Sequence, residues 1–383
     1  MTICCFIDDA GSQVLRVDDR VDVSSSSASI LFAWNVHGHV GDITKHFFKG
    51  APKHASTRLQ LMPAIHAAKG LGYSPSIISL AGSDSAFFSQ GRNVAACVIS
   101  KLTSNVLQDQ EIVARNSLAM AALMLAREIP LILLYCDHHA QSSSLIGDLY
   151  RDLLRLANIV VCPCQSMAQL VQGLLGSNSR VLVVEDSCLV SRQSFPALNS
   201  LESCKLLWFG NAGNAQYLMR ELPGICAKCN AHPSFELTML GDKQTIEELS
   251  FFCKSLMSNK SWSFRFICWD MLDQPSQLNR ALGQAHLTLI PSDTKNIWKV
   301  GVSHNRLVDS IQGGCIAVAS AMQSYQELSQ ISLVGENFPL MINASISQYD
   351  RLSRKYHALR DTQLSRFMPS QIEYSWCNLF RQF

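Results

Sequence analysis

Apolar residues along the chain form two alternating patterns. Short apolar runs such as ILFAW at 30–34 and LILLY at 131–135 stand between polar loops, which is typical of strands buried on both faces of a sheet. Longer segments such as 145–157 carry apolar residues at helical spacing instead. This alternation predicts parallel sheets covered by helices on both faces. The other expected strands are 76–80, 94–100, 159–162, 181–184, 205–209, 235–240, 264–268, 286–290 and 316–319, and the other expected helices include 58–70, 112–127 and 167–175.

The length of the chain and one polar bridge predict two domains. With 383 residues, the chain can build two cores of ordinary size. A polar stretch at 191–203 separates two series of strands and helices, so we expect an N-terminal domain at 28–198 and a C-terminal domain at 199–343. Residues 1–27 end in a run of serines and are expected to be weakly ordered.

Composition argues against several functional classes. Hydrophobic residues make up 48% of the chain and charged residues 16%, as in a globular protein. The net charge of +2, without a polybasic run, gives no basis for binding nucleic acid. The longest apolar stretch, 117–126, is too short to span a bilayer. The first residues lack a basic region and reach Asp8-Asp9 early, so we expect no signal peptide and a cytoplasmic protein.

The 14 cysteines are spread irregularly, which favours reduced thiols over a disulfide framework. One group resembles a metal-binding pattern, because Cys226, Cys229 and His232 have the spacing of three zinc ligands. No second ligand pair follows at a usual distance, however, and the two cysteines lie three apart in an expected helix. Buried thiols are therefore the preferred interpretation, and no metal site is predicted.

The segment 291–320 carries the clearest chemistry in the chain. It follows an expected strand, and Ser303 is expected to cap a helix that ends at Gly313-Gly314. Such a helix begins at the carboxyl edge of a sheet, where its N–H groups and the positive end of its dipole attract anions. The implied ligand is a phosphate or diphosphate, although Arg306 and Asp309 could instead form a surface pair. The side chains placed to meet the anion are Lys299 in the loop and His304, Asn305 and Arg306 in the first turn.

The same segment resembles a known family. The run GVSHNRLVDSIQGGCIAVA is similar in layout to the donor-binding segment of the GT-B glycosyltransferases, particularly the retaining group with an E-x7-E signature (family 4-like, or group 1). Asp309 stands where that family has its second acidic residue, which implies contact with the nucleotide ribose. Gly314 and the strand after it also match. Gly301 departs from the pattern, because it occupies the position of the first Glu.

Three other segments extend the resemblance. The run at 55–80 is similar to the opening of bacterial N-terminal domains of this kind, and Asp137-His138-His139 resembles the D-x-D-D/H element after a mid-domain strand. GNAGN at 210–214 resembles the loop that wraps the donor phosphates. In many relatives this loop carries an Arg and a Lys, so Lys299 and Arg306 would supply the positive charge here. The alternative interpretation of 210–214 is a tight turn between a strand and a helix.

The resemblance implies a GT-B fold, in which two Rossmann-like, doubly wound parallel-sheet domains face each other across a cleft. It also implies that the C-terminal helices at 344–383 return to the N-terminal domain. Ligands of such sheets bind outside the carboxyl ends of the strands. The loops expected at the cleft are 35–42, 137–141, 210–214 and 292–306.

The implied reaction is transfer of a sugar from a nucleotide sugar to a hydroxyl of a glycan or lipid-linked acceptor, without metal or cofactor. His138 and Asp137 are the catalytic candidates, as proton acceptor or dipole. The donor candidates are Gly210, Asn211, Gly213, Asn214, Lys299, His304, Asn305, Arg306 and Asp309, and the acceptor candidates are His37, His39, Arg58 and His139.

Three alternatives stay open at the level of the sequence. Gly301 and the uncharged 210–214 loop suit a catalytically degenerate partner subunit. A nucleotide-sugar 2-epimerase shares the expected architecture, and His232-Pro233 is similar to a pair found in some transferases that use a CMP-activated Kdo sugar. The donor base, peripheral contact with the inner face of a membrane and the oligomeric state are also left open.

Overall fold

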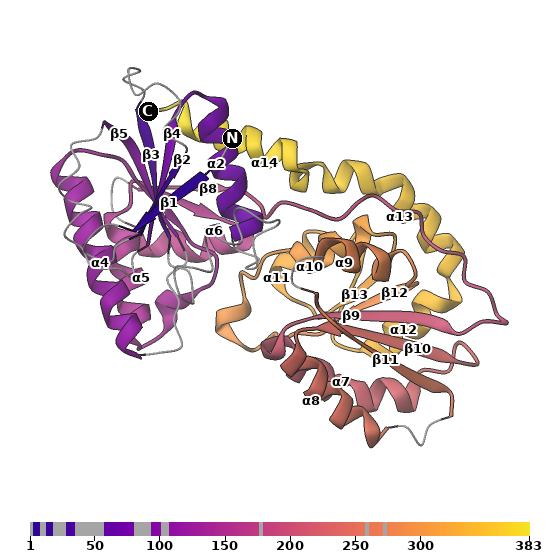
Figure 1. Cartoon of the computed structure of the whole chain (residues 1–383). Helices are drawn as coiled ribbons and strands as arrows, with labels where there is room; N and C mark the ends of the chain where they lie inside the picture. The colour runs from indigo at the N-terminus through magenta and orange to yellow at the C-terminus, as the bar shows by residue number, and fades with distance from the viewer. Residues whose placement is uncertain are drawn as a thin grey trace. The chain divides into compact units, whose positions relative to one another are not determined.

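A computed structural model describes residues 3–7, 13–17, 28–34, 57–79, 93–100, 107–175, 179–256, 260–270 and 274–383. The chain forms two compact units (Figure 1). Unit 1 comprises Met1–Ser187 and Pro369–Phe383, and unit 2 comprises Cys188–Met368. The polar bridge therefore belongs to unit 2, because the Gln193 amide donates to the carbonyl of Gln312 and the Tyr349 hydroxyl donates to that of Pro196. The chain divides after Ser187 and Met368, whereas the sequence placed the divisions after 198 and 343.

The sheet of unit 1 has the strand order β1-β2-β4-β3-β5-β6-β7-β8. The six strands from β4 to β8 in this order are parallel, as predicted. β1 and β2 pair antiparallel and extend the sheet beside β4. These two strands lie inside 1–27, where the serine run had suggested weak order and no strand was expected. The strands are β1 (Ile3–Ile7), β2 (Gln13–Val17), β3 (Ser29–Trp34), β4 (Ser74–Ser79), β5 (Val94–Ile99), β6 (Leu131–Leu134), β7 (Ile159–Cys162) and β8 (Arg180–Val183).

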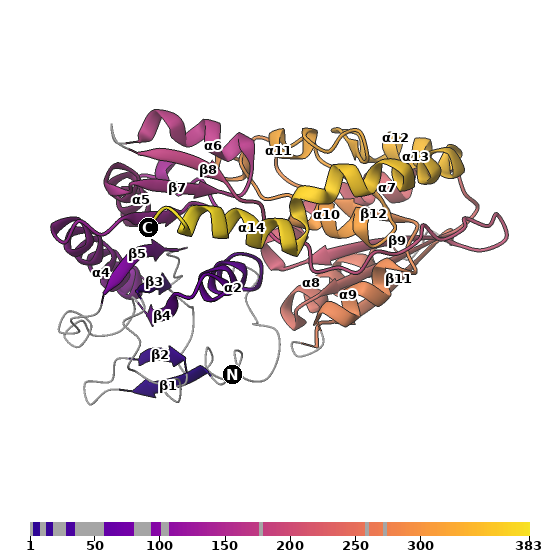
Figure 2. The same cartoon turned by 90° about the horizontal axis from the view of Figure 1, so that it is seen from above.

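Both faces of this sheet are covered, which explains its apolar strands. Along β3, Ile30 and Phe32 belong to one core cluster and Leu31 and Ala33 to the other. The last helix of the chain packs beside α2, where the rings of Phe32 and Phe380 meet edge to face at 6.3 Å (Figure 2). The helical segments of unit 1 are η1 (Thr57–Leu61), α2 (Met62–Gly70), α4 (Leu107–Ala126), η2 (His139–Gln141), α5 (Leu145–Leu156), α6 (Gln165–Val171), η3 (Gln172–Leu174) and α14 (Pro369–Phe380).

The sheet of unit 2 is parallel throughout, in the order β11-β10-β9-β12-β13-β14. The chain moves from β9 to one side, through β10 and β11, and then returns to the other side at β12. Helices α7 and α8 lie on one face and α9 and α10 on the other (Figure 1). The strands are β9 (Cys204–Gly210), β10 (Phe235–Gly241), β11 (Trp262–Cys268), β12 (Leu287–Ile290), β13 (Ile316–Ala319) and β14 (Leu333–Val334).

This reversal of strand order creates a switch point between β9 and β12, where the connections after the two strands diverge and leave a crevice. The doubly wound arrangement predicted from the sequence is therefore confirmed in both units. The helical segments of unit 2 are α7 (Ala212–Lys228), α8 (Lys243–Lys254), α9 (Gln274–Leu282), η4 (Ile297–Lys299), α10 (Asn305–Gln312), α11 (Gln323–Gln326), α12 (Phe338–Ser347), α13 (Tyr349–Leu364) and η5 (Ser365–Phe367).

Cys226 and Cys229 are buried thiols in the core of unit 2 and form no disulfide. Burial and neighbouring thiols raise the pKa of Cys226 to about 12, and burial raises that of Cys229 to about 12. The ring of His232 is engaged by two carbonyl groups, those of Ser234 at 2.9 Å and Asn199 at 3.3 Å. These observations support the interpretation of the group as thiols and a structural histidine.

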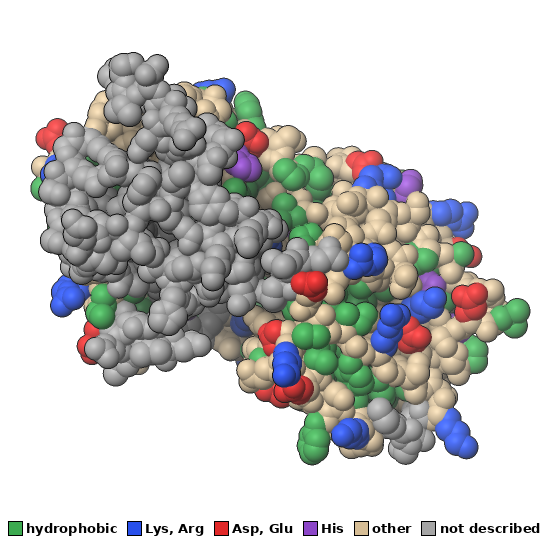
Figure 3. Space-filling model, viewed as in Figure 1, with side chains coloured by type: hydrophobic (Ala, Val, Ile, Leu, Met, Phe, Trp, Pro, Cys, Tyr) green, Lys and Arg blue, Asp and Glu red, His purple; other side chains and the backbone are tan. Residues whose placement is uncertain are grey.

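The surface agrees with the balanced charge of the sequence. On the face shown in Figure 3, basic and acidic side chains of unit 2 are interspersed. Within the described ranges, no helix has the length and apolar character needed to cross a bilayer.

Helix α10 is held at its C-terminal end by a buried arginine. The Arg360 side chain, fully buried, donates to the carbonyls of Gln193, Ile311 and Gln312 at 2.7, 3.2 and 3.3 Å. Its guanidinium also lies 5.4 Å from the ring centre of Phe195. A cation at the carboxyl end of a helix is stabilised by the helix dipole. Arg360 thus joins α13, α10 and the segment that leads into unit 2.

We predict that Gly314→Ala destabilises unit 2 by about 2 kcal/mol or more. Gly314 has φ +83°, and an added Cβ would lie 2.4 Å from the carbonyl oxygen of Ser194. The measurement is the urea midpoint of the full chain, followed by far-UV circular dichroism. Gly224→Ala is the control, since that glycine lies inside α7 with nothing within 4 Å of the added atom. The control should gain about 0.5–1 kcal/mol, and equal midpoints for the two variants would contradict the prediction.

Candidate functional site

The switch point of unit 2 begins where β9 ends, at Gly210. A Cβ on Gly210 would lie 3.1 Å from the Trp208 ring and 3.3 Å from the Cβ of Asn214, so the turn is closely packed. Asn211 is the N-cap residue, and α7 begins at Ala212. Of the two interpretations of 210–214, the structure bears out the tight turn between a strand and a helix, because the chain turns into a helix after one residue. Gly213 and Asn214 lie in the first turn of α7.

The N-terminus of α7 has no side-chain cap. The Oδ1 atom of Asn211 accepts from Nδ2 of Asn214 at 2.9 Å instead of from a backbone N–H, and the first turn holds no acidic residue. By contrast, Asp242 and Asn337 cap α8 and α12 in the same unit through their side chains. Within the described residues, the N-cap side chain thus leaves the first N–H groups of α7 uncapped at the positive end of the helix dipole.

The ends of β12 and β13 are tied together at the same edge. The Ser292 amide donates to Oγ of Ser320 at 2.8 Å, and this hydroxyl donates back to the Ser292 carbonyl at 3.2 Å. Arg220, from α7, donates to the same carbonyl at 3.0 Å. Arg220 is a cation at this edge that the sequence did not indicate, because it lies two helical turns beyond the 210–214 motif.

The connection from β12 to α10 carries Lys299. Asp293 opens a turn by accepting from the Lys295 amide at 3.0 Å. Lys299 then closes the short helix η4, and its amide donates to the carbonyl of Asn296 at 2.8 Å. Lys299 is half-buried and lies on the loop that precedes α10.

Helix α10 begins at Asn305, one residue later than the predicted Ser303 cap implied. His304 is the N-cap residue and makes no capping bond with its side chain, while Oγ of Ser303 accepts from the Asn305 amide at 3.3 Å. No acidic residue lies in the first turn. Because α10 connects the end of β12 to the start of β13, its N-terminus lies at the carboxyl edge of the sheet, as that of α7 does.

Arg306 stands in the first turn of α10. Its Nη1 atom is buried and has no hydrogen-bond partner in the described part of the chain. The alternative surface pair with Asp309 is not formed. A buried guanidinium nitrogen without an acceptor is costly, so this position is suited to an anionic ligand.

His304 anchors the N-terminal end of α10 inside the core of unit 2. The residue is 1% exposed, its ring lies 5.2 Å from that of Phe367, and its Nε2 donates to the Ser324 carbonyl at 2.9 Å. The same nitrogen lies 3.4 Å from a carboxylate oxygen of Glu327, which Arg366 also contacts at 2.8 Å. The Nδ1 atom is buried without a described partner. The ring therefore holds the helix in place, and only Nδ1 is left for a ligand.

Asp309 lies on the second turn of α10, half-buried. The thiol of Cys188 donates to its Oδ1 atom at 3.6 Å, a long bond. Burial, followed by the charge of Asp309, raises the pKa of this thiol. Asp309 is thus close to the point where the chain enters unit 2.

In unit 1, the catalytic candidates follow β6. His138 is 1% exposed, and its Nδ1 atom lies 3.0 Å from the Tyr135 hydroxyl. His139 stacks on Tyr150 at 5.1 Å, and its Nε2 atom lies 3.8 Å from a carboxylate oxygen of Asp137. The two adjacent histidines therefore have different surroundings: His138 is hydrogen-bonded to the Tyr135 hydroxyl, and His139 pairs loosely with Asp137.

The remaining acceptor candidates are less well placed by the structure. Arg58 is half-buried in η1 of unit 1. His37 and His39 lie outside the described residues. The nine donor candidates all belong to unit 2, where they gather along α7, the 292–304 connection and α10, whereas His138, Asp137 and His139 belong to unit 1.

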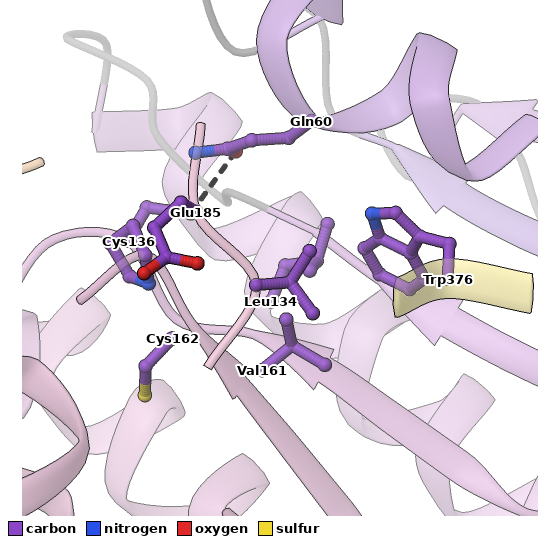
Figure 4. Close-up of a pocket in the computed structure, with 9 residues that line it drawn as sticks. Gln60, Leu134, Cys136, Val161, Cys162, Glu185 and Trp376 are labelled. Carbon is purple, nitrogen blue, oxygen red and sulfur yellow. Dashed lines mark hydrogen bonds between the residues drawn. The ribbon is translucent and has the colours of Figure 1, made fainter. Parts of the chain in front are cut away.

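A small cavity lies at the carboxyl ends of β6, β7 and β8 in unit 1 (Figure 4). Its volume is about 10 Å³, which is room for about one water molecule. Gln60 crosses its rim, where its side chain accepts from the Cys136 thiol at 3.1 Å and donates to Asp186 at 2.8 Å. A space of this size does not hold a sugar, so the cavity is not a substrate site.

Solved structures similar to this chain share its whole architecture. HepE from Anabaena, in complex with UDP and glucose, superposes with a TM-score of 0.62 at 11% identity over 93% of this chain and 100% of that one. Sucrose-phosphate synthase from Thermosynechococcus elongatus gives 0.57 at 9% identity over 93% and 98%. A glycosyltransferase from Rickettsia africae gives 0.51 at 8% identity over 94% and 99%. No family model and no curated protein sequence matches the chain.

The chain has the GT-B fold. Two parallel-sheet α/β units in one chain are the arrangement of these neighbours, and both units of this protein match it. The predicted fold class is thereby confirmed. The resemblance to the retaining E-x7-E group in particular stays a prediction.

We predict that Glu327→Gln lowers the free energy of unfolding near neutral pH by about 1–2 kcal/mol. Burial acts to raise the pKa of Glu327, but His304 and Arg366 outweigh it and bring the pKa to about 2. A carboxyl group with a depressed pKa stabilises the fold above its unfolded pKa of 4.5, and this contribution is lost as the pH falls toward 2. The full shift would correspond to roughly 3 kcal/mol, and we discount it because the side chain is 20% exposed.

The measurement is urea unfolding of wild type and variant from pH 7 down to pH 3. The difference should shrink as the pH falls. Glu247→Gln is the control, because its pair with Lys243 is exposed and spans 3.9 Å. A pH-independent difference for the Glu327 variant would contradict the account.

Proposed function

We propose that the protein is a glycosyltransferase that moves a sugar from a nucleotide sugar to a hydroxyl group of a glycan or lipid-linked acceptor. One observation carries the proposal. At the switch point of unit 2, the N-cap residues of α7 and α10 make no side-chain capping bond and neither first turn holds an acidic residue; within the described residues, a buried Nη1 atom of Arg306 has no hydrogen-bond partner. These features make the carboxyl edge of the unit 2 sheet suitable for binding an anion.

The chemistry of sugar transfer explains why such an edge is needed. As the bond from the sugar to the nucleotide breaks, negative charge develops on the departing diphosphate. Preorganised N–H groups, helix dipoles and cations stabilise that charge without having to reorganise during the step. In this proposal the charge is met by Arg306, Lys299 and the two helix N-termini rather than by a metal ion. Arg220 adds a third cation at the end of β12.

The structural neighbours support a uridine nucleotide. HepE was solved with UDP and glucose, and also with UDP-glucose, where the TM-score is 0.58. Since identities are 11–12%, these ligands guide the choice of donor to test rather than establish it. We place the nucleotide on α10 with Asp309 at the ribose. Unit 1 would supply the acceptor side through Asp137, His138 and His139.

A second candidate function is sugar-nucleotide binding without turnover, as in a partner subunit. Gly301 favours it, because a buried glycine stands where the resembling family carries a carboxylate. Both candidates predict that UDP binds. They differ in whether the sugar of UDP-glucose leaves the nucleotide.

We predict that Arg306→Ala weakens UDP binding by about tenfold or more, because a charged hydrogen bond to the diphosphate is lost. The affinity is measured by titration calorimetry, with UDP, GDP, CMP, ADP and dTDP compared on the wild type. Arg351→Ala is the matched control, since it removes an exposed arginine on α13 of the same unit. Equal affinity in Arg306→Ala and Arg351→Ala would reject the site.

Release of UDP from UDP-glucose then separates the two functions. A transferase releases UDP in the presence of hydroxyl acceptors and forms a glycosylated product, whereas a binding subunit leaves the donor intact. Release of UDP with formation of no acceptor product would favour the epimerase. Failure of all five nucleotides to bind would overturn the nucleotide-sugar proposal altogether.

A further inference from the structure

The Tyr135 hydroxyl group occupies a constrained position at the end of β6. The residue is fully buried, and its ring meets the rings of Tyr150 and His138 edge to face at 5.4 and 6.0 Å. The hydroxyl oxygen accepts from the Ala140 amide at 3.1 Å and lies 3.0 Å from Nδ1 of His138. These are the two hydrogen bonds of this hydroxyl within the described part of the chain.

The hydrogen-bond donors and acceptors around this pair determine the tautomer of His138. A backbone N–H can only donate, so the Tyr135 oxygen accepts from Ala140 and keeps its own proton to give. Nδ1 of His138 is the acceptor within reach, and a buried hydroxyl without an acceptor would be costly. Nδ1 is therefore unprotonated. The second nitrogen, Nε2, carries the hydrogen of the neutral ring.

The surroundings of His138 keep the ring neutral. Burial lowers its pKa first, and the neighbouring His139 lowers it further. A neutral ring whose Nδ1 atom is occupied and whose Nε2 atom already bears a hydrogen has no vacant nitrogen to take a proton. This argues against the general-base role that the sequence suggested for His138. The ring is instead a hydrogen-bond donor of fixed direction.

The backbone that fixes Ala140 is itself braced. Arg151 on α5 donates to the carbonyls of Ala140 and Ser142, the latter at 2.8 Å. Gly147 allows this close approach, because a Cβ there would lie 2.1 Å from the Ser142 carbonyl oxygen. The Ala140 amide, and with it the Tyr135 hydroxyl, is thus held by α5 rather than by the loop alone.

We propose that Tyr135 is a positioning residue that holds His138 in the Nε2–H tautomer, so that His138 donates a hydrogen bond from Nε2 to an oxygen of the acceptor bound to unit 1. The second half of this statement rests on the proposed function, and the first half does not. Tyr135 itself contacts no substrate and acts only through His138.

The test is a two-bond proton–nitrogen NMR spectrum of the full chain labelled with ¹⁵N-histidine, because the two neutral tautomers give different patterns. The variant His138→Gln identifies the resonances of His138. The decisive variant is Tyr135→Phe, which keeps the buried ring and removes only the hydroxyl. Tyr73→Phe is the matched control, since it removes a tyrosine hydroxyl that donates to the Phe380 carbonyl at 3.1 Å in the same unit.

We expect the NMR pattern of the Nε2–H tautomer for His138 in the wild type and in Tyr73→Phe. In Tyr135→Phe this pattern should be lost or should become a mixture of the patterns of the two tautomers. In the transfer assay, Tyr135→Phe should lower kcat by about tenfold, with the KM for the nucleotide sugar changed less. His138→Gln, whose amide can still donate, should retain more activity than His138→Ala.

An Nδ1–H pattern in the wild type, or an unchanged pattern in Tyr135→Phe, would overturn the proposal whatever the activity. If the NMR spectrum shows the expected Nε2–H pattern but the protein transfers no sugar, the role of Tyr135 in fixing the tautomer is supported and the proposed function is rejected. Equal activity of His138→Gln and His138→Ala would reject the donor role alone.

Discussion

The placement of α10 is the constraint on which the candidate site depends. The helix is held at its carboxyl end by the buried guanidinium of Arg360 and at its amino end by His304, which is bonded to Ser324 and lies beside Glu327. Arg360 suits the carboxyl end, because a cation stabilises the negative end of a helix dipole. The anchors hold the first turn of the helix, together with Arg306, at the edge of the sheet, where the amides of Asn305 and Arg306 donate to the side chains of Ser303 and Asn305.

Parallel pairing explains why the other site elements gather at the same edge. All six strands of unit 2 run in one direction, so every helix that follows a strand begins at the carboxyl edge. At the switch point, α7 and α10 leave the sheet on opposite faces (Figure 1), and both begin at its carboxyl edge. The proposed anion site thus rests first on the topology, and the side chains at this edge would select the anion.

The fold was largely predictable because buried parallel strands appear in the sequence as continuous apolar runs, such as LILL in β6 and IAVA in β13. Contacts between residues distant in sequence were not predictable. The burial of His304 depends on Ser324 and Phe367, and Arg220 reaches the site across α7. The sequence left 210–214 open between a loop and a tight turn into a helix, because Gly and Asn residues favour turns and helix starts alike. The tautomer of His138 could be inferred only from the position of the Ala140 amide, which the sequence does not give.

Hydrogen–deuterium exchange of the full chain with and without saturating UDP tests the central claim most directly. The account predicts slower exchange in peptides that cover 210–216 and 302–309, because the N–H groups at the starts of α7 and α10 would bind the diphosphate. Peptides from β1 and β2 should not change. Protection confined to unit 1, or equal exchange in both states with UDP demonstrably bound, would contradict the placement of the nucleotide on α7 and α10.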